Sequence, residues 1–86
     1  MNELNLSVAT SLFPNPVKDV ITIDFSGYAL DDVEVRIINL LGKEEGIYHN
    51  KWCNKMKLNL ENLLPGLYIA EIRSKNGVVC KKFLKE

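Results

Sequence analysis

Apolar and polar side chains alternate along several short stretches of the chain, with the period of two that is typical of β-strands. The alternation runs through residues 19–25, 33–40, 56–60 and 67–72. Because successive side chains of a strand point to opposite faces, each stretch presents one apolar face. Together these faces predict a core that includes Ile21, Ile23, Phe25, Val35, Ile37, Leu58, Tyr68, Ala70 and Ile72.

The C-terminal part of the sequence predicts a β-hairpin. Pro65-Gly66 precedes one extended run, and Lys75-Asn76-Gly77 separates it from a second run that covers residues 78–85. Asn and Gly accept the positive φ angles that a tight hairpin turn requires. Gly66 is expected to need a backbone conformation that side chains disfavour, because it enters the strand directly from a turn.

Turn-forming residues also divide the rest of the chain. Residues 6–13 could form a short first strand, which Pro14-Asn15-Pro16 would end because proline lacks an amide hydrogen. Ser26-Gly27-Tyr28 and Asp31-Asp32 are expected in a loop. Leu41-Gly42-Lys43 predicts another turn, after a strand over residues 33–40.

Two stretches do not follow a regular alternation. At Ile38 and Leu40 the apolar residues change face, which indicates a bulge or a strand covered on both faces. In residues 44–55, Ile47 and Tyr48 suggest a short strand, and Trp52 is expected to cover the core while partly buried. About seven short strands without helical spacing predict an all-β sandwich, organised as a single domain over residues 1–86.

Composition fits such a domain, with 47% hydrophobic residues in a chain of 86. No apolar run approaches the length of a membrane span, which is about 18 residues. Met1-Asn2-Glu3 shows no feature of a signal peptide, so the sequence would be an excised fragment if the native protein is exported.

The net charge is zero but it is unevenly distributed, with −5 over residues 1–50 and +5 over residues 51–86. The two halves could pair their strands and neutralise each other, or a basic surface near the C-terminus could be recognised by a partner. A sequence pI of about 6.6 argues against nucleic acid as that partner.

The sequence contains no pattern that indicates catalysis. His49 is the single histidine, and no nucleophile elbow or phosphate-binding glycine loop is present. The neighbouring carboxylates of Asp31-Asp32 and Glu44-Glu45 would point to opposite faces of a strand. Cys53 and Cys80 could form one disulfide or be two small buried hydrophobic residues, and their spacing fits no zinc motif. We therefore expect no enzyme, cofactor, metal or small-molecule substrate.

Several spaced motifs resemble those of the C-terminal sorting domain of the type IX secretion system, which ends many proteins exported by Bacteroidetes. They are Leu12-Phe13-Pro14-Asn15-Pro16, Ile38-Asn39-Leu40-Leu41-Gly42-Lys43, and Leu63-x-x-Gly66-x-Tyr68 followed by Lys81-Lys82-Phe83-Leu84-Lys85. The resemblance covers residues 7–85. One departure is Pro65, because many members place this proline one residue earlier.

The resemblance implies an immunoglobulin-like sandwich of seven strands that is not an enzyme. It also implies passage of a cargo through the periplasm, recognition by the outer-membrane translocon, and removal of the domain by a sortase-like surface protease. The cargo is then attached to the cell surface or released, and the cleavage site is expected at or before residue 10. The matching residues are Pro14, Asn15, Pro16, Gly42, Lys43, Gly66, Tyr68, Lys81, Lys82, Phe83, Leu84 and Lys85.

Two hypotheses belong to different classes of function. As a sorting signal, the domain would present Lys81, Lys82 and Lys85 at an exposed strand edge, where a translocon could read them and where strand addition could occur. As a carbohydrate-binding or adhesive module, it would need an exposed aromatic platform, which only Trp52, Tyr48 and Tyr28 could supply.

Overall fold

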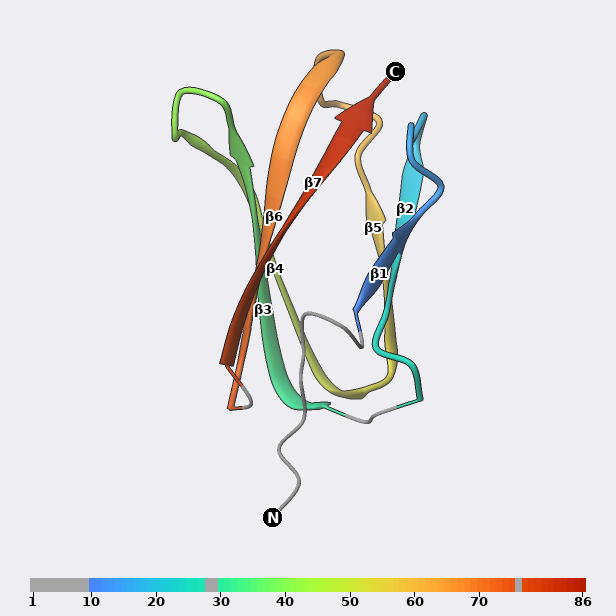
Figure 1. Cartoon of the computed structure of the whole chain (residues 1–86), viewed down its shortest axis with the longest axis vertical. Helices are drawn as coiled ribbons and strands as arrows, with labels where there is room; N and C mark the ends of the chain where they lie inside the picture. Colours follow the sequence, from blue (N-terminus) through green and yellow to red (C-terminus); the bar gives the residue numbers. More distant parts are fainter. Residues whose placement is uncertain (1–9, 28–29, 76) are drawn as a thin grey trace.

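The computed structural model of the chain describes residues 10–27, 30–75 and 77–86, and it shows two β-sheets packed face to face (Figure 1). The strands are β1 (Ser11–Phe13), β2 (Val20–Asp24), β3 (Leu30–Asn39), β4 (Glu44–Cys53), β5 (Lys55–Asn59), β6 (Gly66–Ser74) and β7 (Gly77–Lys85). The predicted all-β sandwich of seven strands is confirmed. No helix in the described ranges is long and apolar enough to cross a membrane.

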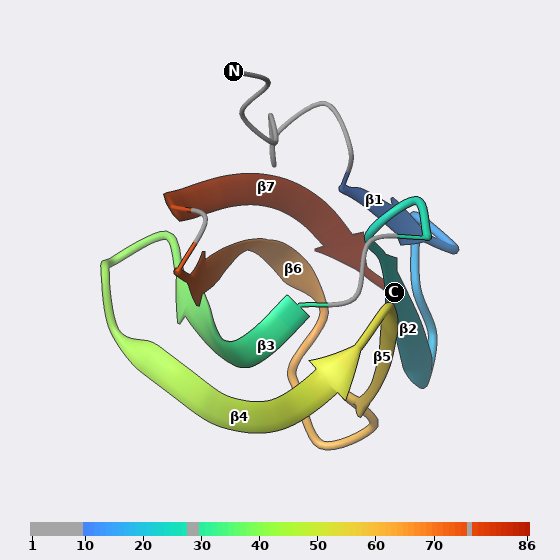
Figure 2. The same ribbon diagram turned by 90° about the horizontal axis from the view of Figure 1, so that it is seen from below.

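Every strand pairing is antiparallel. One sheet has the order β1-β2-β5 and the other has the order β4-β3-β6-β7. Seen from below, the larger sheet curves strongly, and the smaller one lies across its open side (Figure 2). The chain passes from the large sheet to the small one between Cys53 and Lys55.

The core fills the space between the two sheets. All of the predicted core residues are buried, and Ile21, Ile23 and Phe25 have no exposed surface. The cluster also contains residues beyond the predicted set: Val17, Leu30, Val33, Cys53, Met56, Leu60, Val79 and Phe83. The two-residue periodicity therefore predicted the inner faces correctly. Val33, Val79 and Phe83 lie on such faces inside β3 and β7, whereas Val17 comes from the β1–β2 loop.

Strand boundaries differ from the prediction in the first part of the chain. β1 is limited to Ser11–Phe13, and residues 6–9 lie outside the described residues. The expected loop at Asp31-Asp32 is wrong, because β3 already begins at Leu30. Leu30 is buried and pairs with Cys53 of β4. Because both the pairing and the core continue to Leu30, β3 includes the polar residues Asp31 and Asp32.

The irregular middle of the chain forms one long strand. β4 extends over ten residues, where only a short strand near Ile47 was expected, because β3 supplies a partner along its length. The predicted irregularity near Ile38 is confirmed as a register shift between Ile37 and Ile38 in the pairing with β4. The turn at Leu41-Gly42-Lys43 is also confirmed, and Gly42 has a φ of 83°.

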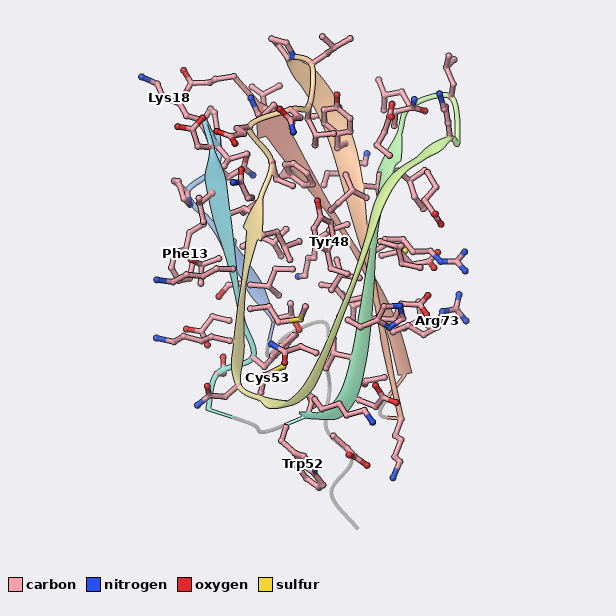
Figure 3. All side chains as sticks on the ribbon, turned by 180° about the vertical axis from the view of Figure 1, so that it is seen from behind. Phe13, Lys18, Tyr48, Trp52, Cys53 and Arg73 are labelled. Carbon is pink, nitrogen blue, oxygen red and sulfur yellow. The ribbon has the colours of Figure 1, made fainter. Side chains whose placement is uncertain are left out.

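Trp52 does not cover the core, which corrects the sequence-based expectation. Its side chain is 73% exposed, and Figure 3 shows the indole pointing away from the sandwich at one end. Trp52 has a φ of 50°, a left-handed conformation that costs about 1–2 kcal/mol for a residue with a side chain. This conformation turns the chain from β4 toward β5 so that Cys53, the next residue, points into the core.

The two cysteines are free and have opposite environments. Cys53 is buried between the sheets (Figure 3), and burial raises the pKa of its thiol. Cys80 is exposed on β7. The prediction that both cysteines are small buried hydrophobic residues is therefore correct for Cys53 and wrong for Cys80.

Among the described residues, ion pairs join the acidic and basic halves of the sequence at two places. Lys55 Nζ lies 3.9 Å from Asp24 Oδ2, and Lys75 Nζ lies 2.7 Å from Asp31 Oδ2. The hydrogen bond from Lys75 to Asp31 raises the pKa of the lysine. Pairing between the halves thus neutralises part of the uneven charge distribution.

Candidate functional site

The sequence motifs come together at one end of the sandwich, which we call the motif end. It consists of the β1–β2 loop (14–19), the β3–β4 turn (40–43), the β5–β6 loop with the start of β6 (60–68), and the end of β7 (81–86). In Figure 1 these segments all lie at the top, where the C-terminus is marked. Strand direction explains this gathering, because each of these segments precedes or follows a strand at the same end of the sandwich.

The proline-rich loop holds the end of β7. The N–H of Leu84 donates a hydrogen bond to Asn15 Oδ1 at 2.9 Å. Val17 donates from its N–H to the Leu84 carbonyl at 2.8 Å and accepts from the Glu86 N–H at 2.8 Å. Val17 is completely buried and forms a parallel bridge with Lys85. The opening and terminal motifs are therefore parts of one structure.

β7 is an edge strand of the larger sheet, as the strand-addition hypothesis requires. Leu84 points its N–H and C=O away from β6, toward Asn15 and Val17. Alternation in an antiparallel ladder directs the same groups of Val78 and Lys82 to this free edge. Among residues 10–27, 30–75 and 77–86, no strand pairs with that part of β7. With respect to the described residues, the edge is thus covered at its C-terminal end and unpaired before it.

The Gly66-x-Tyr68 motif connects the loop before β6 to the terminal strand. Gly66 has a φ of 152° and lies opposite Lys85. Tyr68 stacks on Phe83 with ring centroids 5.7 Å apart, and its hydroxyl donates a 2.6 Å hydrogen bond to the Leu64 carbonyl. Burial, and secondarily the negative charge of Glu45, raises the pKa of Tyr68. The aromatic ring thus packs in the core while its hydroxyl fixes the adjacent loop.

Asn39 organises the middle turn. Its side-chain Oδ1 accepts hydrogen bonds from the N–H groups of Leu41 at 2.9 Å and Lys43 at 3.0 Å. Its backbone accepts from Gly42 N–H at 3.0 Å and donates to the Lys43 carbonyl at 2.9 Å. Sequence reasoning considered Gly42 and Lys43 but missed the role of Asn39. An Asn placed three residues before a turn glycine was the available sign, because Asn side chains often bond to nearby turn amides.

The terminal lysines have three different environments. Lys82 is exposed on the outer face of β7, and Lys81 is half-buried on the inner face. Lys85 is only 6% exposed, and its ammonium group donates a hydrogen bond to the Glu86 main-chain oxygen at 3.0 Å. The expectation of three exposed lysines therefore holds for Lys82 alone: Lys81 is half-buried and Lys85 is buried. Odd-numbered residues of β7 face the core, and the long aliphatic stem of lysine tolerates that position.

The aromatic side chains that a carbohydrate platform would use are not gathered on one surface. Tyr48 is half-buried and packs against the core, whereas Trp52 lies exposed at the end opposite the motif end (Figure 3). Tyr28 lies outside the described residues. A pocket of about 320 Å³ lies elsewhere, on the outer face, and Glu34, His49 and Arg73 are among its lining residues. No group of three potential metal ligands occurs in the described part of the chain.

Comparison with known proteins agrees with this geometry. The family described as secretion system C-terminal sorting domain matches residues 11–86, and the chain belongs to this family. It thereby carries a type IX sorting signal, the class of function that the motifs indicated.

A solved structure confirms the type of sandwich. The chain is similar to the crystal structure of a DUF3244 family protein from Bacteroides vulgatus with an immunoglobulin-like β-sandwich fold, with a TM-score of 0.75 and 17% identity. The alignment covers 91% of this chain and 84% of that chain. At this identity the likeness shows the fold alone, and the predicted immunoglobulin-like architecture is confirmed. A search of the curated proteins found no match.

Proposed function

We propose that this domain directs an exported cargo, located N-terminal to it, to the type IX translocon of the outer membrane, and that the motif end is the surface that the translocon reads. The observation that carries the proposal is the contact between Asn15 and Leu84, which joins motifs separated by 69 positions. Residues that only stabilised the sandwich would not need to gather at one end. A signal read by a single receptor would gain from such an arrangement.

The open part of the β7 edge supports one mode of recognition. An extended segment of the translocon can add to Val78–Lys82 through main-chain hydrogen bonds. Lys82 stands exposed beside this edge and discourages indiscriminate pairing, while it offers a charge to a partner with a complementary carboxylate. Strand addition would leave the core unchanged, because the added strand contacts only the sheet edge.

The rest of the proposed pathway follows from the family. The cargo crosses the periplasm with this domain at its C-terminal end, and the translocon exports it across the outer membrane. A sortase-like surface protease then cuts at or before residue 10, and the cargo is attached to the surface or released. The domain itself acts as a folded signal without catalytic activity, cofactor or small-molecule substrate.

An export assay tests the proposal. A periplasm-directed fluorescent reporter is fused to the N-terminal side of residues 1–86 and expressed in a bacterium with an active type IX system. We expect the reporter on the cell surface or in the medium of this bacterium. In an otherwise identical strain that lacks the translocon, we expect it in the periplasm. The matched control fuses the same reporter to residues 1–76, which omits β7. Equal export with and without the translocon would contradict the proposal.

The adhesive or carbohydrate-binding alternative is tested separately. Pull-down of the isolated domain with insoluble polysaccharides would detect such an activity. Binding that is lost in Trp52→Ala would favour the alternative, since Trp52 is the exposed aromatic side chain at the opposite end. We expect no retention above that of the Trp52→Ala variant.

A further inference from the structure

The outer edge of β7 carries a row of main-chain groups that no strand of the described residues pairs with. Val78, Cys80 and Lys82 occupy the positions of the antiparallel ladder that do not exchange hydrogen bonds with β6. Their N–H and C=O groups therefore face away from the sheet. Leu84 has the same orientation, and its two groups bond to the β1–β2 loop. Such a row of main-chain groups is a template for an added strand.

The β1–β2 loop limits the length of an added strand. Asn15 Oδ1 accepts a hydrogen bond from the N–H of Leu84, and the N–H of Val17 donates to the Leu84 carbonyl. Val17 also forms a parallel bridge with Lys85. The loop thus already occupies the place of a neighbouring strand beside the last residues of β7. An added strand must end beside Lys82, because the loop blocks the edge beyond it.

The unpaired part of the edge is positively charged. Lys81 is half-buried on the inner face of β7, and Lys82 is exposed on the outer face. Within the described ranges, no ion pair joins either ammonium group to a carboxylate. Residues 77–83 include no acidic residue, and the charged residues opposite them on β6 are Glu71 and Arg73, which pair with each other at 3.0 Å. After those two charges cancel, the edge keeps the charges of its lysines.

From these observations we propose that the edge of β7 binds a short acidic strand of the translocon. The strand pairs with Val78–Lys82 through main-chain hydrogen bonds, and two consecutive acidic residues in it lie beside Lys81 and Lys82. The acidic residues must be consecutive because successive side chains of a strand point to opposite faces, as the two lysines do. Asn15 sets the register, since it marks the end of the available edge. This inference rests on the proposed function and names the chemistry of the partner.

Two other partners fit the edge less well. A second copy of this domain would bring the same lysines and no acidic residue over residues 77–83. A register that places Lys81 opposite its own copy also brings like charges together, which destabilises a strand pair. An anionic membrane offers phosphate groups but no main-chain groups, and lipid-binding segments use clusters of about four to eight basic residues.

Amide hydrogen exchange measured by NMR tests the pairing in the isolated domain, residues 1–86. The probe is a short synthetic peptide in which alternating valine and threonine flank two central glutamates. We expect the N–H groups of Val78, Cys80 and Lys82 to exchange rapidly in the free domain and to be protected by this peptide. Peptides with two central glutamines or two central lysines are the matched controls and should protect less. Slow exchange without peptide, equal protection by all three peptides, or protection by none would overturn the proposal.

A proline on the edge tests strand addition in the reporter fusion. In Cys80→Pro the missing N–H is one that faces the free edge, so no hydrogen bond to β6 is lost. We expect export to fall by about tenfold or more, because the added strand loses main-chain bonds. His49→Pro is the matched control, because the same alternation, followed across β6 and β3, directs the His49 N–H to the other free edge of this sheet. Equal export of the folded Cys80→Pro and His49→Pro variants would reject strand addition.

Charge reversal tests the acidic residues of the partner. Lys81→Glu combined with Lys82→Glu should lower export by about tenfold or more, because like charges across an interface oppose binding. Lys51→Glu combined with Lys57→Glu changes the net charge equally at exposed positions of β4 and β5, and it is the matched control. Equal loss in the two double variants would reject an acidic partner. Thermal melting verifies that the variants fold, and Lys82→Glu alone repeats the test at a fully exposed strand position.

The outcomes separate this inference from the proposed function. Failure of the unmodified fusion to be exported would reject the proposed function itself. Export of the unmodified fusion together with normal export of Cys80→Pro and of the Lys81 and Lys82 double variant would reject only the acidic strand. A photo-crosslinking amino acid at position 80 of the exported fusion should give an adduct with a translocon protein, and one at position 51 should not.

Two measurements on the isolated domain identify the other partners. Analytical ultracentrifugation should show a monomer, and a dimer that Cys80→Pro abolishes would assign the edge to a second copy. Flotation with phosphatidylglycerol vesicles should leave the domain in the unbound fraction. Flotation that depends on Lys81 and Lys82 would assign these charges to a lipid surface and overturn the acidic strand.

Discussion

Asn15 and Leu84 are 69 positions apart in the sequence, yet the side-chain oxygen of Asn15 lies 2.9 Å from the backbone nitrogen of Leu84 and accepts its hydrogen bond. The side chain of Asn15 takes the place that a neighbouring strand would occupy at this edge of β7. The bond therefore stabilises the terminal strand and closes its edge at the same time.

Removal of this acceptor should loosen the end of β7. We expect Asn15→Ala to lower the free energy of unfolding by about 1 kcal/mol, the usual net value of one hydrogen bond. Amide hydrogen exchange measured by NMR should accelerate at Leu84 and Glu86, while exchange at Ile72 in the core should change little. Asn15→Asp keeps an acceptor oxygen and is the control. Unchanged exchange at Leu84 in the alanine variant would show that the bond does not hold the strand.

Gly66 should be required for the structure of the motif end. Its φ of 152° is rarely adopted by residues with a side chain, although a Cβ atom at this position would meet nothing within 4 Å. Steric space is thus available, and any cost comes from the backbone conformation. Gly66→Val should destabilise the domain by at least about 1 kcal/mol.

Thermal melting measures that cost, and Gly66→Ala separates its causes. Both variants should melt at a lower temperature, because both carry a Cβ atom at a conformation that disfavours one. A melting temperature equal to that of the unmodified domain would assign the glycine to recognition and not to folding.

The two thiols should react at very different rates. Cys80 is exposed and Cys53 is buried, so iodoacetamide should modify Cys80 in the folded domain and Cys53 only after unfolding. Mass spectrometry of digested peptides distinguishes the two sites. Modification of both at similar rates in native buffer would contradict the burial of Cys53.

Burial of Cys53 also predicts a pH dependence. The pKa of the folded-state thiol is raised by desolvation, so the unfolded state releases its proton first as the pH rises. The stability that the neutral thiol supports is present below the unfolded-state pKa and is lost as the pH rises through the folded-state value. Cys53→Ala should remove this alkaline component from unfolding curves measured by urea titration, and Cys80→Ala should leave it in place.

The sequence predicted the inner faces of the strands well because burial follows a simple period. Phe25 and Ile72, for example, lie on apolar faces that alternate with polar neighbours, and both are fully buried. Trp52 shows where such reasoning ends. A large aromatic residue is usually buried, but the left-handed conformation of Trp52 directs its side chain to solvent. No local sequence pattern predicts that conformation.

The motif residues could be picked out from the sequence, but their arrangement in space could not. Pro14 to Pro16, Gly66 and the terminal residues were recognised from their motifs, yet nothing in the sequence indicated that Asn15 would bond to Leu84. That contact depends on how a loop of one sheet crosses to the edge of the other. The position of Lys85 could not be predicted either. A lysine is normally solvated, but the alternation of side chains along β7 directs Lys85 toward the core.

The burial of Lys85 changes how the role of the terminal lysines must be tested. Simultaneous replacement of Lys81, Lys82 and Lys85 by alanine would combine an exposed, a half-buried and a buried position, so loss of export would not distinguish recognition from folding. Single variants separate the two effects. Lys82→Ala should change stability by no more than about 0.5 kcal/mol, because exposed charges contribute little, and should lower export if the translocon reads this charge.

Lys85 should behave in the opposite way. Lys85→Ala removes the buried aliphatic stem and should destabilise the domain by about 1–2 kcal/mol. Lys85→Met keeps the volume and removes the buried charge, so its stability should equal or exceed that of the unmodified domain. Chemical denaturation provides these values, and the reporter fusion measures export of the same variants. Normal export of Lys85→Met would show that the Lys85 charge is not part of the signal, while loss of export at full stability would show that the translocon recognises this charge.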